Sequence, residues 1–217
     1  MHYRIRGLTI RSENAAKTPR EVSRPLAEWL ERNIHVGAAL DYGCGRLRYT
    51  PYLARCCETL GLVDSLDQLD RTTRIAGRLT NIRAHAMRKW PGCRVYSVEE
   101  FWGGVRERYD FVLCANVLSA IPSQGIRSRS LRAIHGCLSR SGTILVVNQH
   151  TNSYFTEAGN KSNSVLHLDG WILRSTRGPA YFGILRRDKI NRLLRAHGFH
   201  VQDGWIEGQS NYVLAGR

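Results

Sequence analysis

The stretch LDYGCGRLRY, residues 40–49, ends an apolar run with an acid and then places two glycines close together. Glycines at a strand-to-helix turn let the backbone approach a nucleotide, because they have no side chain to obstruct it. The dinucleotide pattern G-x-G-x-x-G would need its third glycine at Arg48. Asp41 would repel a phosphate and suit an ammonium or sulfonium group. The stretch therefore indicates a positively charged nucleotide-like ligand, and a plain tight turn at Gly43 and Gly45 is the structural alternative.

Two more polar residues end β-rich runs further along the chain. Asp64 ends the run LGLVD, nineteen residues after Gly45, and an acid at the end of a second strand can accept both hydroxyls of a ribose. Asn116 lies near the end of YDFVLCANVL, the strongest strand pattern in the sequence. Asp64 could instead cap the next helix, and Asn116 could be an ordinary loop residue.

From residue 25 onward, short β-rich runs alternate with helical patterns, which is typical of βαβ units and a mostly parallel sheet. A chain of 217 residues fits a single domain. We predict that Gly142 stops the helix before it and that the last segment is an antiparallel hairpin. The predicted strands are 37–43, 60–64, 93–98, 109–118 and 143–149, the helices are 20–34, 47–60, 66–80, 126–142 and 186–199, and the hairpin is 200–216.

Together these features resemble the class I S-adenosylmethionine-dependent methyltransferases, whose first motif runs acid-x-Gly-x-Gly-x-Gly. Asp41, Gly43 and Gly45 match this motif, and Leu47 replaces its last glycine. YDFVLCANVL and LSRSGTILVV resemble the family's segments around the fourth and fifth strands. The resemblance implies an α/β, doubly wound domain over residues 1–217. Its mostly parallel seven-stranded sheet would carry helices on both faces and a C-terminal antiparallel hairpin.

The resemblance also implies S-adenosyl-L-methionine as the cofactor. In this family an acid at the end of the third strand often contacts the adenine amine. Ser97 occupies the corresponding position in this chain, so we expect Ser97 and the Val98 backbone to hold the adenine. Lys17 and Thr18 could cover the methionine carboxylate, or belong to a solvated basic N-terminal arm over residues 1–24. The cofactor-binding candidates are Asp41, Tyr42, Gly43, Cys44, Gly45, Asp64, Ser65, Ser97, Val98, Asn116 and Val117.

Residues 150–183 lie where the family places its acceptor-binding residues. This segment is too long and polar for a simple connector, so we predict a substrate lid. Histidine and tyrosine side chains there could orient or deprotonate an acceptor. A surface or packing role is the alternative for each of the catalytic candidates, which are His150, Tyr154, His167 and Tyr181.

Composition narrows the possible partners. The formal net charge of +14 favours a polyanion, although the arginines are spread along nearly the whole chain. None of the six cysteines forms a C-x-x-C pair, so we expect neither a metal site nor disulfides. We therefore expect the protein to lie in a reducing compartment. No stretch has the apolar length of a signal peptide or a membrane span, so we expect a cytoplasmic protein without a membrane partner.

The leading hypothesis is a methyltransferase that acts on an oxygen or nitrogen atom of a small molecule. An RNA or DNA acceptor held by arginines is the first alternative. A non-catalytic, cofactor-binding partner subunit is the second, and Leu47 in the glycine motif is the feature that favours it. The sequence leaves the acceptor and the oligomeric state open.

Overall fold

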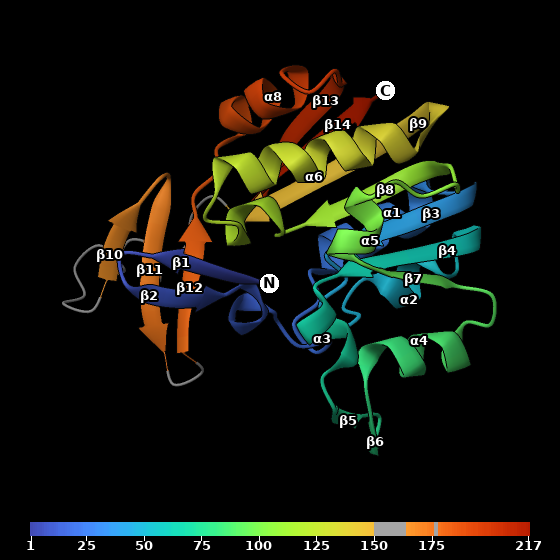
Figure 1. Cartoon of the computed structure of the whole chain (residues 1–217). Coiled ribbons are helices and arrows are strands. Elements are labelled where there is room, and N and C mark those ends of the chain that lie inside the picture. Colours follow the sequence, from blue (N-terminus) through green and yellow to red (C-terminus); the bar gives the residue numbers. More distant parts are fainter. Residues whose placement is uncertain (150–163, 176–177) are drawn as a thin grey trace.

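The computed structural model describes residues 1–149, 164–175 and 178–217 (Figure 1). Its main sheet has seven strands in the order β13-β14-β9-β8-β3-β4-β7. β14 runs antiparallel to both of its neighbours, and the other pairings are parallel. The predicted α/β fold, with its terminal hairpin, is confirmed. The strands are β3 (Val36–Tyr42), β4 (Cys57–Asp64), β7 (Arg94–Ser97), β8 (Tyr109–Ala115), β9 (Leu138–Gln149), β13 (His200–Glu207) and β14 (Ser210–Gly216).

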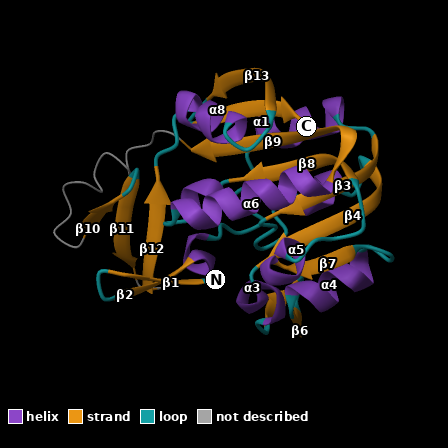
Figure 2. Ribbon diagram, turned by 45° about the horizontal axis from the view of Figure 1, so that its top comes forward, coloured by secondary structure: helices purple, strands orange, loops and turns teal. Residues whose placement is uncertain are grey.

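Helices cover both faces of this sheet (Figure 2). Side chains alternate along β8: Phe111 and Leu113 belong to one buried cluster, and Val112 and Cys114 to the other. The cluster with Phe111 also holds residues of α1 (Arg24–Asn33), α2 (Thr50–Leu53), α3 (Leu66–Asp70) and α4 (Ile82–Lys89). The cluster with Val112 holds residues of α5 (Val98–Trp102), α6 (Gln124–Cys137) and α8 (Arg187–Arg195).

Two of the predicted helices are helical over only a few residues, and each segment also contains strand. Of 47–60, only Thr50–Leu53 is helical, and the chain enters β4 at Cys57, which pairs with Val36. Of 66–80, α3 ends at Asp70, and the hairpin of β5 (Thr73–Ile75) and β6 (Arg78–Thr80) follows. Its turn residues, Ala76 and Gly77, both have positive φ, as two-residue hairpin loops require.

Gly142 does not stop a helix, contrary to the prediction. α6 ends at Cys137, and β9 begins at Leu138. The pairing of β9 with β8 jumps from Tyr109 opposite Leu138 to Phe111 opposite Thr143. A Cβ atom on Gly142 would lie 2.7 Å from the Tyr109 carbonyl oxygen, so the close approach of the two strands at this irregular pairing requires a glycine.

The expected basic arm is folded. β1 (His2–Ile5) and β2 (Leu8–Arg11) form a hairpin, and the short 3-10 helix η1 (Ser12–Ala15) follows. The described part of the expected lid is an antiparallel sheet of β10 (Ser164–His167), β11 (Gly170–Ser175) and β12 (Gly178–Gly183). The two units pack together through a buried cluster of Tyr3, Ile10, Ile121, Ile172 and Tyr181.

No helix in the described parts of the chain combines the length and apolar character that a membrane crossing requires.

Candidate cofactor and acceptor site

A pocket at the C-terminal ends of β3, β4 and β8 gathers the predicted cofactor residues. Ten of the eleven candidates line it, and Ser97 does not. The N-terminal segment, the 3-10 helix η2 (Leu118–Ala120) and β12 supply much of the remaining lining. The parallel strands thus bring Asp41, Asp64 and Asn116 to one edge of the sheet, as α/β folds do for ligand sites.

The loop after β3 carries three residues in the left-handed region: Gly43 (φ 79°), Gly45 (φ 56°) and Leu47 (φ 63°). A Cβ atom on Gly43 would lie 2.3 Å from Cγ2 of Val117, so only glycine fits where the loop meets the end of β8. Leu47 adopts a left-handed conformation that favours glycine, and its side chain is buried. Packing of this side chain offsets the strain of its backbone.

Asp64 links the loop to the end of β4. Its Oδ2 accepts a hydrogen bond from the Gly45 N–H at 2.7 Å, and its Oδ1 accepts one from the Ser65 N–H at 2.7 Å. Burial raises the pKa of Asp64, and these two backbone bonds oppose that rise. A carboxylate oxygen can accept a second hydrogen bond, so both oxygens can still accept ligand hydroxyls.

Asp41 lies buried at the base of the same pocket. Its Oδ2 accepts a hydrogen bond from the Thr50 hydroxyl at 2.6 Å. Burial raises its pKa to about 6, the Thr50 bond and the Arg48 charge oppose the rise, and the Asp64 charge adds to it. Asp41 is therefore ionised at neutral pH and can pair with a cationic group of a ligand.

The side chains of Asn116 and Ser97 both form hydrogen bonds that stabilise the local fold. Asn116 has φ 61°, and its Oδ1 accepts a hydrogen bond from the Gln149 N–H at 3.1 Å. The Ser97 hydroxyl accepts from the Glu100 N–H at 3.2 Å, and Glu100 Oε2 accepts from the Ser97 N–H at 2.6 Å. This capping box starts α5 and holds Ser97 away from the pocket. The expected adenine contact is therefore left to Val98, which lines the pocket.

Two of the four catalytic candidates, His167 and Tyr181, lie among the described residues, and their ring centroids are 5.9 Å apart. Tyr181 lines the pocket, its hydroxyl donates to Asp169, and burial raises its pKa, so the phenol stays protonated at neutral pH. His167 does not line this pocket, and its Nε2 lies 2.9 Å from the Pro122 carbonyl oxygen. His150 and Tyr154 lie outside the described residues.

No protein-family profile matches the chain. The uncharacterized protein YmfD of Escherichia coli K12 is 34% identical over 221 residues, which cover 100% of this chain and 96% of YmfD. The chain belongs to the YmfD family.

Several solved structures that are similar to this chain are methyltransferases. The 1,6-didemethyltoxoflavin-N1-methyltransferase of Burkholderia thailandensis matches with a TM-score of 0.62 and 17% identity, over 89% of this chain and 77% of that one. The N-methyltransferase NodS of Bradyrhizobium japonicum matches with a TM-score of 0.58 and 12% identity, over 89% and 84%. An S-adenosylmethionine-dependent methyltransferase of Clostridium acetobutylicum matches with a TM-score of 0.61 and 11% identity, over 91% of this chain and 93% of that one. The chain has the class I methyltransferase fold.

In this member of the YmfD family, the N-terminal segment supplies site residues that the sequence reasoning did not assign. These are Met1, Tyr3 and Glu13, which line the pocket. Lys17, a candidate from the sequence, lines it too, and its Nζ donates to Gln149 Oε1 at 3.2 Å. Burial and the Arg48 charge lower the pKa of Lys17. The Arg6–Gly7 turn between apolar residues could have predicted the hairpin, but no sequence signal points to Glu13.

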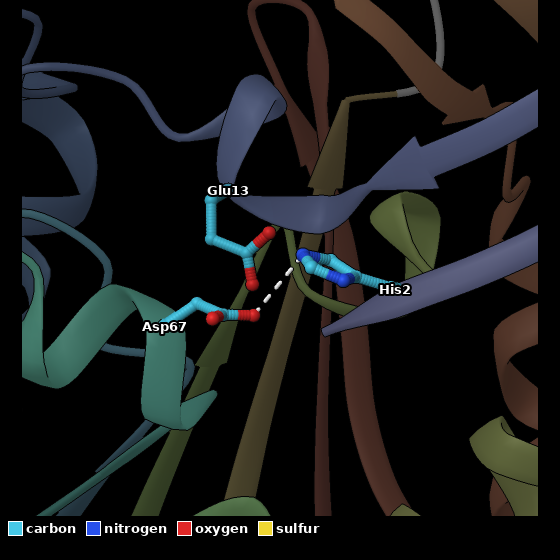
Figure 3. Close-up of side chains that lie close together, drawn as sticks. All are labelled: His2, Glu13 and Asp67. Atoms are coloured by element: carbon cyan, nitrogen blue, oxygen red, sulfur yellow. Dashed lines mark ion pairs between the residues drawn. The ribbon is translucent and has the colours of Figure 1, made fainter.

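Three side chains beside this pocket could hold a metal ion: His2, Glu13 and Asp67, whose ligand atoms all lie within 4.8 Å of one another (Figure 3). His2 Nε2 lies 3.1 Å from Asp67 Oδ2, and Glu13 forms an ion pair with the Met1 ammonium. A cation would have to compete with that ammonium for Glu13. The expectation of no metal site stays a prediction.

Proposed function

We propose that the chain transfers a methyl group from S-adenosylmethionine to an oxygen or nitrogen atom of a small molecule. The convergence of Asp41, the Gly43–Gly45 loop and Asp64 on one pocket carries this proposal. The class I methyltransferase fold supports it, and so do similar structures that contain S-adenosylhomocysteine.

The residues present fit this cofactor. Asp64 would accept the ribose hydroxyls, and ionised Asp41 would face the positively charged methionine end. Val98 would border the adenine, and Lys17 would lie near the carboxylate. When bound, S-adenosylmethionine supplies a methyl group that is activated by its positively charged sulfur.

The acceptor would bind where η2, β12 and the N-terminal hairpin meet the same pocket. Tyr3, Ile121, Tyr181 and Phe182 give this side an apolar and aromatic character, which suits a small and largely apolar acceptor. Protonated Tyr181 can orient an acceptor but cannot take its proton. The protein would contribute chiefly alignment, which can lower a barrier by several kcal/mol without covalent chemistry.

An RNA or DNA acceptor is kept as the alternative because of one observation. Residues 71–98 contain no acid, and the exposed hairpin β5–β6 lies within this segment. Such a surface attracts polyanions. The basic residues of the segment are Arg71, Arg74, Arg78, Arg83, Arg88, Lys89 and Arg94.

We also propose a cytoplasmic location, because six free cysteines suit a reducing compartment.

Label transfer from methyl-labelled S-adenosylmethionine tests the proposed function. The purified chain is incubated with the small-molecule fraction of a cell extract, and in parallel with total RNA and DNA, with Asp64→Ala as the control. We expect label in small molecules with the wild type and much less with the variant. Label in RNA or DNA would favour the alternative, and no transfer with intact cofactor binding would favour a non-catalytic subunit.

A further inference from the structure

We propose that Glu13 is a second ribose-binding carboxylate, opposite Asp64, and that the N-terminal segment thereby completes the nucleoside site. This inference rests on the proposed function, because it needs the cofactor to bind in the pocket.

The position of Glu13 ties it to the ribose acid. Glu13 comes from η1, is only 7% exposed, and lines the same pocket as Asp64, Ser65 and Gln68. Its Oε1 accepts a hydrogen bond from the Ser65 hydroxyl. The Ser65 N–H donates in turn to Asp64 Oδ1 at 2.7 Å. One residue therefore connects the two carboxylates.

The second oxygen of Glu13 lacks a partner. Within residues 1–149, 164–175 and 178–217, Glu13 Oε2 is buried and forms no hydrogen bond. A buried acceptor without a donor is unfavourable and needs an explanation, such as a ligand that the site is built to take. The ribose of the cofactor offers two hydroxyl donors, and both Glu13 and Asp64 line the pocket.

The neighbours of Glu13 leave this oxygen available. Figure 3 shows His2 paired with Asp67 beside it, so the imidazole is directed to the other acid. The Met1 ammonium pairs with Glu13 through Oε1. That positive charge, together with the positive charge of the cofactor, offsets the repulsion between two carboxylates near one ribose.

Calorimetric titration with S-adenosylhomocysteine tests the role of Glu13. We expect Glu13→Gln to weaken binding at least tenfold, because an amide is a weaker acceptor than a carboxylate. Glu28→Gln, on the exposed surface of α1, is the matched control and should leave binding unchanged. Thermal melting monitors folding. If Glu13→Gln does not fold, Glu13→Asp keeps the charge but shortens the side chain, and we expect it to weaken binding severalfold.

Ligands that lack one ribose hydroxyl separate a direct contact from an indirect effect. The titrations are repeated with 2′-deoxy and 3′-deoxy analogues of S-adenosylhomocysteine. For one of them, the difference between wild type and variant should vanish, since the hydroxyl that Glu13 binds is missing. Unchanged binding by a folded variant, or an equal loss with all three ligands, would overturn the inference alone. No binding of S-adenosylhomocysteine by the wild type would overturn the proposed function as well.

Discussion

Arg127 and Asp169 form a buried ion pair with two hydrogen bonds, Nη1 to Oδ2 at 2.6 Å and Nη2 to Oδ1 at 2.9 Å. The Arg127 Nε also donates to the Ile121 carbonyl oxygen at 2.9 Å, and Asp169 accepts from Tyr181 and from Lys189. Ile121 and Tyr181 both line the pocket on its acceptor side. The pair therefore connects α6 to two segments that line the pocket, the one at Ile121 and the one at Tyr181.

Removal of one partner should destabilise the protein strongly. Arg127→Met leaves Asp169 buried without its main counter-charge, and such changes lower the free energy of unfolding by about 3–5 kcal/mol. Arg32→Met, which breaks an exposed pair with Glu28, should cost less than about 1 kcal/mol. Urea denaturation measures both values. Equal losses in the two variants would contradict the structural role of the buried pair.

Asp41 should make cofactor binding depend on pH. Burial raises its folded-state pKa to about 6, above the ordinary value of 3.8. Its ionisation therefore opposes folding: the stabilising effect of the neutral form is complete below the ordinary value and is lost as pH rises through about 6. We expect affinity for S-adenosylmethionine to increase as pH rises through about 6, because the carboxylate then carries the charge that attracts the cation.

Asp41→Asn should separate stability from binding. At neutral pH the variant should unfold with a free energy higher by roughly 1–3 kcal/mol, because no charge is buried. It should bind S-adenosylmethionine more weakly and lose the pH dependence near 6. Thermal melts and titrations on either side of that pH measure these effects, with exposed Asp188→Asn as control. A variant that keeps the wild-type pH dependence would rule out Asp41 as its origin.

Alanine substitution at two glycines with nearly equal φ values should distinguish the cost of backbone strain from the cost of a steric clash. Gly43 (φ 79°) meets Val117, whereas Gly77 (φ 81°) has no atom within 4 Å of its ideal Cβ position. Gly77→Ala should cost only about 1–2 kcal/mol of strain. Gly43→Ala should cost more and also weaken S-adenosylhomocysteine binding, and Val117→Ala should restore part of the loss. Urea denaturation measures the stability costs, and titration measures the loss of binding. Equal costs at both glycines would contradict a steric clash between Gly43→Ala and Val117.

Sequence periodicity predicts the sheet better than the short elements around it. Asp41, Asp64 and Asn116 could be placed because each ends a β-rich run and parallel strands end at one edge. Leu53, Cys56 and Leu60 fit a helical spacing, but pairing with β3 draws the chain into a strand from Cys57.

Other errors have equally local causes. The Ala76–Gly77 turn reverses the chain within a segment that looks helical. The roles of Ser97 and Glu13 depend on partners outside their own strand or turn: Glu100 lies in the first turn of α5, and Ser65 is distant in sequence. The S-x-x-E pattern of Ser97 and Glu100 is a capping signal that a local reading of the sequence could have found, whereas no local pattern indicates the pairing of Glu13 with Ser65.

The excess of basic residues should produce only weak binding to nucleic acid if the acceptor is a small molecule. We expect RNA and duplex DNA to bind in the non-specific range of about 10⁻⁴–10⁻⁶ M, with affinity that falls steeply as salt increases. Titration of mixed pools at two salt concentrations, followed by a label-transfer assay, measures this. Selective binding that persists at high salt, with label in the polymer, would replace the small-molecule acceptor by a nucleic acid.

Titration calorimetry with S-adenosylmethionine and S-adenosylhomocysteine tests the central claim most directly. We expect saturable binding of both by the wild type, and a loss of about 1–3 kcal/mol in Asp64→Ala, which removes a charged acceptor from the ribose. Asp188→Ala, on the exposed surface of α8, is the matched control and should bind like the wild type. No binding by the folded wild type, or equal affinity in Asp64→Ala, would contradict the assignment of this pocket to the cofactor.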